Sequence, residues 1–184
     1  VNACTIFMAN DGKNVWIGNN EDELQNTKYR MWYYPAQKNS YGYTIWTDLN
    51  IKIKFLNKLN PQGGLNEFGL FLDYTAIDEI TAVKDEQKKD RKKQVVTDLL
   101  INCKTVEDAL LYLNKYNLIK LLNVQLFIGD ASGNYATVTG GYIVRKTDNN
   151  FALTNYCINN GHKEACHRRD VATHYLNSTT SFQL

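Results

Sequence analysis

The amino-acid sequence predicts a layered α+β fold in one domain. The 184 residues suit a single domain with a sizeable core. Hydrophobic residues make up 43% and charged residues 22% of the chain, as is typical of a folded globular protein. The apolar patterns follow the order strands, two helices, strands and a last helix, which favours a layered α+β arrangement over a parallel doubly wound sheet.

The first part of the chain is expected to form strands. Apolar residues 4–9 and 15–18 flank a polar turn in which Gly12 can take a positive φ, so a β-hairpin is predicted to begin at Cys4. Aromatic residues indicate two more strands within residues 29–47. Residues 64–75 predict two strands around an Asn-Glu-x-Gly turn.

Two helices are expected next, followed by strands. Helical spacing covers residues 95–103, and a second helix is predicted over residues 109–116. Thr105 and Asp108 have the spacing of a capping box. The second helix is expected to turn Leu110, Leu111 and Leu113 toward the core. Further strands are predicted at 124–129, 135–138, 142–144 and 151–155, and a last helix at 162–176, whose Arg168 and Arg169 are expected to point to solvent or to acids.

Composition argues against several classes of protein. The net charge of +2 is too small to indicate a nucleic-acid or membrane partner. No apolar run approaches the roughly 20 residues of a membrane span. The four cysteines have no CxxC spacing and are too few to suggest a disulfide scaffold. We expect no cofactor, and homo-oligomerisation stays open.

The first three residues have the pattern that a signal peptidase leaves. Val1-Asn2-Ala3 places a small residue at each of the two key positions, so cleavage after Ala3 would make Cys4 the first residue. That interpretation puts the protein in the periplasm or outside the cell. A cloning scar explains the same residues equally well. Either way, we expect residues 1–3 to be leftover sequence and residues 4–184 to form one domain, whose completeness at its C-terminal side stays open.

Cys4 has a chemical role available to it if it becomes the first residue. An α-amino group has a pKa of about 8, low enough to accept a proton at neutral pH. The amine can therefore act as general base for its own thiol, with no histidine required. The alternative is that Cys4 is a buried cysteine of a strand.

Four short blocks in order suggest a family. They are Cys4-Thr5-Ile6 with Gly18-x-Asn20-x-Asp22, then Gly64-Leu65-Asn66-Glu67-x-Gly69-Leu70, then Asp130-Ala131-Ser132-Gly133, and last Leu153-Thr154-Asn155. Together they resemble the choloylglycine hydrolases, penicillin V acylases and related acyltransferases, which are N-terminal-nucleophile (Ntn) hydrolases of linear amide C–N bonds. Asn19 stands where this family usually has arginine.

The resemblance implies a fold and a set of site residues. The fold is a four-layer αββα sandwich, truncated here at its C-terminal side because relatives continue with more strands and a late arginine. Cys4 would be the nucleophile, Asp22 would position the thiol and the α-amine, and Asn155 would hold the oxyanion or the amine. Asn20 and Tyr74 are the further candidates for substrate or oxyanion binding.

The implied function is cleavage of a non-peptide linear amide C–N bond in a small molecule, through a thioester on Cys4. Acyl transfer to another amine would use the same intermediate. Two alternatives stay open: a catalytically inactive relative that acts as a binding module, and a zinc module. The zinc ligands would be Cys157, His162, Cys166 and His167, since His162 and Cys166 would share one helix face, although the spacing matches no standard finger. The preferred interpretation contains no metal.

Overall fold

The structure is a computed structural model that describes residues 4–22, 26–49, 60–82, 84–91, 93, 95–156, 158 and 166–179. The strands are β1 (Thr5–Asn10), β2 (Val15–Asn20), β3 (Tyr29–Tyr34), β4 (Tyr43–Asp48), β5 (Gly63–Asn66), β6 (Phe71–Ala76), β7 (Lys89–Asp90), β8 (Tyr116–Asn117), β9 (Val124–Gly129), β10 (Tyr135–Thr139), β11 (Tyr142–Arg145) and β12 (Phe151–Leu153). The helices are α1 (Val96–Asn102), α2 (Val106–Leu113) and α3 (His167–Ser178).

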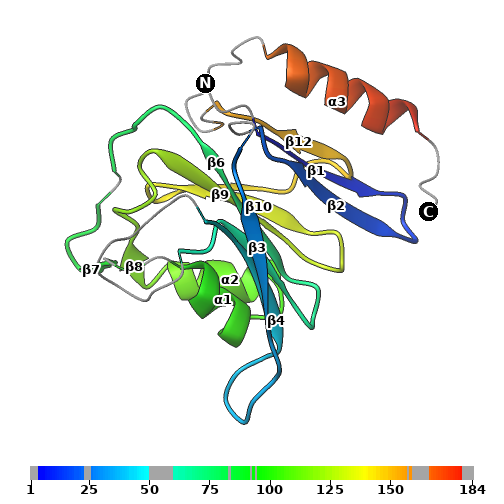
Figure 1. Cartoon of the computed structure of the whole chain (residues 1–184). Coiled ribbons are helices and arrows are strands. Elements are labelled where there is room, and N and C mark those ends of the chain that lie inside the picture. The colour runs from blue at the N-terminus through cyan, green and yellow to red at the C-terminus, as the bar shows by residue number, and fades with distance from the viewer. Residues whose placement is uncertain are drawn as a thin grey trace.

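These elements stack in four layers (Figure 1). Helix α3 covers a three-stranded sheet of order β12-β1-β2, which packs on a seven-stranded sheet of order β11-β10-β9-β6-β5-β4-β3. Helices α1 and α2 cover the far face of the larger sheet. Neighbouring strands run antiparallel in both sheets. The αββα layering expected from the sequence is confirmed, and a short parallel β7–β8 pair is an addition that the sequence did not predict.

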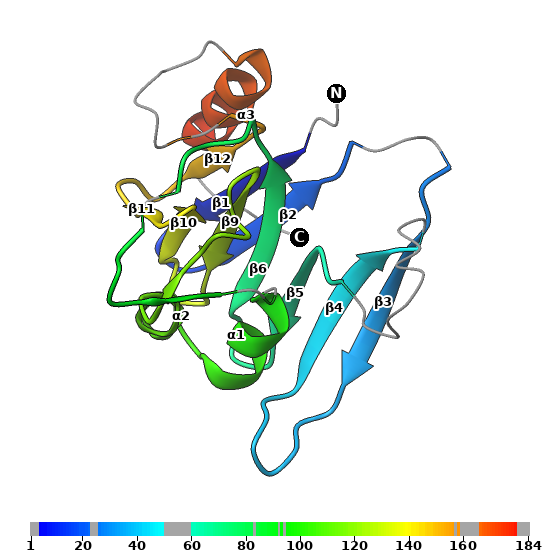
Figure 2. The ribbon, with the colours of Figure 1, turned by 90° about the vertical axis from the view of Figure 1, so that its left-hand side faces the viewer.

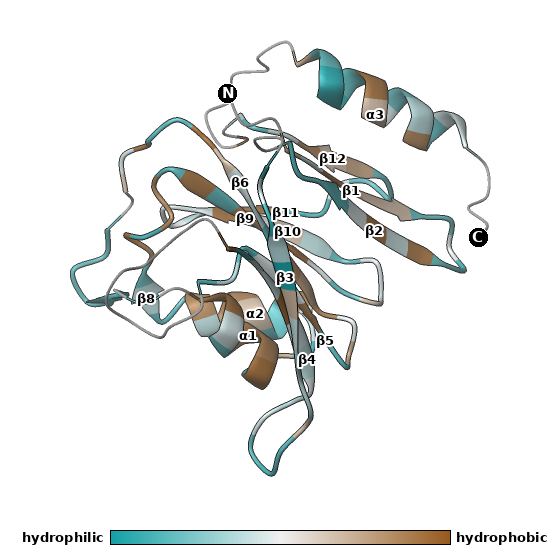
Figure 3. Cartoon of the chain, in the orientation of Figure 1, coloured by the Kyte–Doolittle hydropathy of each residue, from teal (hydrophilic) through white to brown (hydrophobic). Residues whose placement is uncertain are grey.

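Each interface between layers has its own apolar core. The largest core lies between the seven-stranded sheet and helices α1 and α2, which are coloured as largely hydrophobic in Figure 3. Side chains alternate along a strand, so β1 sends Ile6 and Met8 toward the larger sheet and Phe7 and Ala9 toward α3. Strand β1 is therefore buried on both faces, which explains its continuous apolar run.

Strands β3 and β4 extend beyond the smaller sheet, as Figure 2 shows. Trp46 of β4 contacts Phe71, which belongs to the core between the sheets. Met31 of β3 pairs with Trp46, so it faces the same way, yet it is 52% exposed. The smaller sheet thus covers the part of the larger sheet around β6, β9 and β10 and leaves this apolar end open.

Most predicted elements lie where the sequence placed them. Gly12 takes φ 85° in the first hairpin turn, and the Thr105–Asp108 capping box is present at the start of α2. Two details were wrong. Helix α2 begins at Val106, directly after its cap, and Leu111 is 60% exposed because Leu110 and Leu113 take the inner face.

Helix α3 begins at His167, with Cys166 as its N-cap residue. The predicted start at residue 162 lies outside the described residues. No helix within the described part of the chain is long and apolar enough to cross a membrane.

Asn66 ties the β5–β6 turn to the end of α1. Its side-chain amide donates to the carbonyls of Leu100 and Cys103 at 2.9 and 2.8 Å, and its Oδ1 accepts from the backbone N–H groups of Phe68 and Leu70. The side chain is buried, with 4% of its surface exposed. Three of these four hydrogen bonds are buried, so their backbone groups would lose a partner away from water if the amide were removed.

We expect Asn66→Ala to lower the free energy of unfolding by about 2–4 kcal/mol, because it leaves buried backbone carbonyl and N–H groups without a hydrogen-bond partner. Urea denaturation followed by circular dichroism measures the change. Asn102→Ala removes one exposed amide at the end of α1 and should change the unfolding free energy by less than about 0.5 kcal/mol. Equal effects of the two variants would contradict the prediction.

Candidate active site

Strand register places Cys4 between two polar residues. On one side Thr5 pairs with Asn20, and on the other Ile6 pairs with Leu153. Continuing each antiparallel register by one and two residues sets Cys4 opposite Glu21 and opposite Asn155. Directly opposed residues have their Cβ atoms about 5 Å apart on the same face of the sheet. All three side chains therefore gather at the end of β1, on the face toward the larger sheet.

The Cys4 thiol is buried and hydrogen-bonded. Its residue is 4% exposed, and the thiol donates to Glu21 Oε2 at 3.1 Å. Burial, followed by the hydrogen bond and the charge of Glu21, raises the pKa of the Cys4 thiol to about 12. Hydrogen bonds from the Asp22 backbone and the Asn155 side chain act in the opposite direction. The sulfur is consequently a neutral thiol at physiological pH.

Asn19 links two carboxylates next to this thiol. Its Nδ2 donates to Glu21 Oε1 at 2.5 Å and to Asp73 Oδ2 at 2.7 Å. Asp73, on β6, is completely buried. Burial, and then the charge of Glu21, hold the pKa of Asp73 well above its ordinary value, while the Asn19 amide opposes the shift.

Arg168, in the first turn of α3, reaches the same site. Its guanidinium donates to the Cys4 carbonyl oxygen at 3.0 Å and to Asn155 Oδ1 at 3.3 Å. Asn155 Nδ2 in turn donates to the carbonyl of Ala76 at 3.0 Å. The expectation that Arg168 points to solvent or to an acid was wrong, whereas Arg169 does pair with Asp170. The only sequence signal for Arg168 was its place in a helix after the Leu-Thr-Asn block.

The structure brings some of the sequence-predicted residues together and separates others. Cys4 and Asn155 meet, and Asp22 contributes its backbone N–H while its side chain is exposed. Asn20 pairs with Thr5, so the pleat turns it to the other face of the small sheet, and it is exposed. Glu21, which the sequence argument passed over, is the carboxylate at the thiol.

Tyr74 does not lie near Cys4. It packs against the core formed with α1 and α2, on the opposite side of the larger sheet. The reason is again strand alternation: Asp73 and Thr75 face the small sheet, where Asp73 meets Asn19 and Thr75 meets the Thr154 carbonyl. Tyr74, between them, must face the helices. The expectation that Tyr74 contacts the oxyanion was therefore wrong, because its side chain lies on the other side of the larger sheet from Cys4.

The zinc alternative finds little in the described residues. Cys157 and His162 lie outside them, and Cys166 Sγ is 3.1 Å from Thr154 Oγ1. Cys166 is the N-cap residue of α3. Within the described ranges, no group of three or more His, Cys, Asp or Glu side chains is arranged to hold a metal ion.

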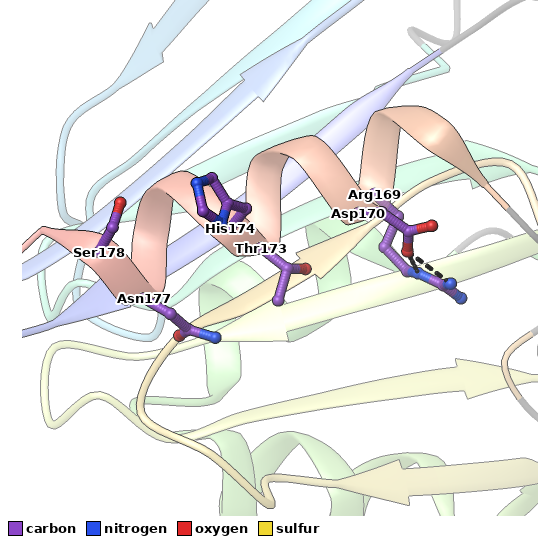
Figure 4. A pocket seen from close by; sticks show the side chains of 6 residues that line it. All are labelled: Arg169, Asp170, Thr173, His174, Asn177 and Ser178. Carbon is purple, nitrogen blue, oxygen red and sulfur yellow. Dashed lines mark hydrogen bonds and ion pairs between the residues drawn. The ribbon is translucent and has the colours of Figure 1, made fainter.

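A separate hollow of about 530 Å³ lies on the outer side of α3 (Figure 4). It is lined by Arg169, Asp170, Thr173, His174, Asn177 and Ser178. None of the residues around the Cys4 thiol lines it. The hollow and the cysteine site are therefore distinct, and the reactive groups favour the cysteine site.

The chemistry available at the site is that of a nucleophile with donors beside it. The thiol donates a hydrogen bond to Glu21, and the Asn155 amide and the Arg168 guanidinium lie at the same end of β1. Removal of residues 1–3 would add an α-amine on the same residue. Such a set suits attack on a carbonyl carbon and stabilisation of the resulting oxyanion.

Comparison with solved structures places the fold. A mutant of conjugated bile acid hydrolase from Clostridium perfringens matches 96% of this chain with a TM-score of 0.60 at 12% sequence identity. This chain spans 57% of the length of that hydrolase. The four-layer arrangement is thus the Ntn-hydrolase fold that the sequence blocks predicted.

Two other structures are similar at lower scores. Penicillin V acylase from Agrobacterium tumefaciens matches 83% of this chain and 49% of its own, with 18% identity and a TM-score of 0.47. Another variant of the Clostridium perfringens enzyme matches 96% of this chain and 50% of its own, with 14% identity and a TM-score of 0.46. No family model and no curated protein matches the sequence.

The thiols are expected to differ in reactivity in a chain that keeps Val1–Ala3. Burial raises the pKa of Cys166, but the Thr154 hydrogen bond, backbone N–H groups of α3 and the Arg168 charge outweigh it and leave the pKa below its ordinary value. Burial raises the pKa of Cys103 to about 11. Iodoacetamide at pH 7.5 should therefore modify Cys166 at least about tenfold faster than Cys4 or Cys103.

Peptide mapping by mass spectrometry measures the three rates. The Cys4 rate should keep rising, by about tenfold per pH unit, through pH 9, because a group with a raised pKa is still mostly protonated there. A plateau of the Cys4 rate below pH 9, or a Cys4 rate equal to that of Cys166, would contradict the description of the site.

Proposed function

We propose that this protein is a cysteine Ntn hydrolase that cleaves a non-peptide linear amide C–N bond of a small molecule. One observation carries the proposal: the Cys4 thiol lies directly before β1, with the Asn155 side chain opposite it, in a four-layer fold similar to that of a conjugated bile acid hydrolase. Because the chain spans 57% of that enzyme, the activity is argued from the residues of this site.

The reaction begins once Cys4 is the first residue. We propose cleavage after Ala3, which also implies that the protein is exported to the periplasm or secreted. The freed α-amine accepts the thiol proton, and the sulfur attacks the carbonyl carbon of the amide. The C–N bond then breaks, and the leaving amine takes the proton back from the α-ammonium. Water, activated by the same amine, hydrolyses the thioester and releases the acid.

The neighbouring residues have separate tasks in this scheme. Asn155 donates an N–H to the oxyanion, an interaction typically worth about 3 kcal/mol of barrier. Arg168 fixes both Asn155 and the Cys4 backbone through its two hydrogen bonds. The Asp22 backbone N–H steadies the sulfur as negative charge develops on it.

The raised pKa of the thiol is compatible with this proposal. In a chain that keeps Val1–Ala3 the nitrogen of Cys4 is an amide and cannot accept a proton, so the sulfur stays a thiol. The free α-amine would add a base of pKa about 8 on the same residue, able to take the thiol proton at neutral pH. Transfer of the acyl group to an amine instead of water would proceed through the same thioester, and the acceptor decides between the two outcomes.

We expect Cys4→Ala to abolish hydrolysis and Cys4→Ser to lower it steeply, in a chain that begins at residue 4. A panel of conjugated bile acids, penicillin V and N-acyl amines provides substrates, and chromatography of the released amine measures the rate. Cys103→Ala removes a thiol from the far side of the larger sheet and should leave the rate unchanged. Mass spectrometry should find the acyl group on the Cys4 peptide.

The alternative is that the protein is a catalytically inactive binding module, and evidence for it would contradict this proposal. It predicts that a chain beginning at Cys4 hydrolyses no member of the panel and acquires no acyl group, while it still binds a ligand. Hydrolysis that survives in Cys4→Ala would equally reject Cys4 as nucleophile.

Asn155→Ala should lower kcat about 100-fold with a smaller change in KM, because the lost N–H acts on the oxyanion. The matched control is Asn177→Ala, which removes an exposed amide from α3 and should leave kcat unchanged. A change confined to KM would assign Asn155 to substrate binding instead.

A further inference from the structure

Four side chains form a continuous hydrogen-bonded chain behind the sulfur. Cys4 Sγ donates to Glu21 Oε2 at 3.1 Å, and Asn19 Nδ2 donates to Glu21 Oε1 at 2.5 Å and to Asp73 Oδ2 at 2.7 Å. The two oxygens of Glu21 thus have different partners, the thiol on one and the Asn19 amide on the other. Rotation of the carboxylate would break one contact or the other.

The backbone explains why these residues meet. Asn19 and Glu21 are two positions apart at the end of β2, so both face the larger sheet. Asp73 is on the facing surface of β6, and its own orientation is fixed because its Oδ1 accepts the backbone N–H of Tyr74 at 2.8 Å. The series of hydrogen bonds therefore begins at Asp73, a fully buried residue of β6, and ends at Cys4, the candidate nucleophile.

The charges give the arrangement a definite effect on the thiol. A carboxylate 3.1 Å from the sulfur accepts a hydrogen bond from S–H but repels a thiolate. Asn19 brings no positive charge, so neither Glu21 nor Asp73 is neutralised through it. Glu21 therefore aims the S–H and keeps the proton on sulfur.

We propose that Glu21 is the positioning residue of the Cys4 thiol, held in place by the Asn19 bridge to Asp73. This inference rests on the proposed function in that the thiol is taken as the nucleophile. When the α-amine is free, the proton leaves sulfur for that amine and the carboxylate then faces an ammonium. In this scheme Glu21 directs the transfer, and the α-amine is the base.

The test is the pH dependence of Cys4 alkylation without substrate. Glu21→Gln keeps the size of the side chain and removes the charge, so the apparent pKa of the thiol should fall. Alkylation of Cys4 by iodoacetamide at pH 8 should then rise at least about threefold, with Cys103 and Cys166 unchanged as internal references. Glu86→Gln removes one exposed negative charge elsewhere and should leave the Cys4 profile as it is. An unchanged profile in Glu21→Gln overturns the proposal.

The Asn19 bridge is tested by a double-mutant cycle. Asn19→Leu removes the amide that holds Glu21. It should change the rate of Cys4 alkylation at pH 8 in the parent chain. In the Glu21→Gln background the same substitution should change it by less than about twofold, since the carboxylate it held is gone. Independent, multiplying effects would overturn the role of the bridge.

Folding and function are separated by two further measurements. If Glu21→Gln does not fold, Glu21→Asp retracts the carboxylate by one methylene and should also raise Cys4 alkylation at pH 8, whereas an unchanged rate overturns the proposal. Amide hydrolysis is followed in parallel, where Glu21→Gln should lower kcat more than KM. Loss of hydrolysis in all forms with the alkylation shift present would reject the proposed function and leave the positioning of the thiol standing.

Discussion

The site depends on one constraint, the double antiparallel pairing of β1. Ile6 pairs with Asn19 on one side and with Leu153 on the other. These registers bring Cys4, the end of β2 and the end of β12 close together. A shift of one residue in either pairing would turn a whole set of side chains to the other face. Since Ile6, Met8 and Leu153 are fully buried between the sheets, such a shift would expose apolar surface, and the register is strongly specified.

Several residues that carry the family resemblance serve the fold. Asn66 satisfies four backbone groups between α1 and the β5–β6 turn. Asp130 is 2% exposed, and it accepts the N–H groups of its own turn on one oxygen and that of Val106 on the other. A Cβ on Gly18 would lie 2.5 Å from the Phe7 ring. The packing of the layers depends on these residues, so their presence indicates the fold more directly than the chemistry.

The polar groups around Cys4 form a connected network in which Cys4 and Asp73 are buried and the other side chains are partly buried. Glu21, Asn19 and Asp73 share hydrogen bonds on one side of the sulfur, and Asn155 and Arg168 do so on the other. A carboxyl as buried as that of Asp73 is tolerable only where it has such partners. The same contacts that make burial tolerable also fix the direction of each side chain. A preorganised donor acts on a developing charge without first having to move.

By itself, the sequence determined the layered fold, nearly every strand and the capping box, because apolar periodicity and turn residues act locally. The family resemblance of its short motif blocks indicated Cys4 and Asn155 as site residues. Only the tertiary structure decided which polar side chains meet the thiol. Glu21 rather than Asn20 meets it because the pleat of β2 selects alternate residues, and Tyr74 is excluded by the same rule on β6. Arg168 arrives from α3, a contact between residues 164 positions apart that no local pattern encodes. The sequence therefore predicted Cys4 as the candidate nucleophile, whereas the residues that surround its thiol are determined by how the two sheets and α3 pack.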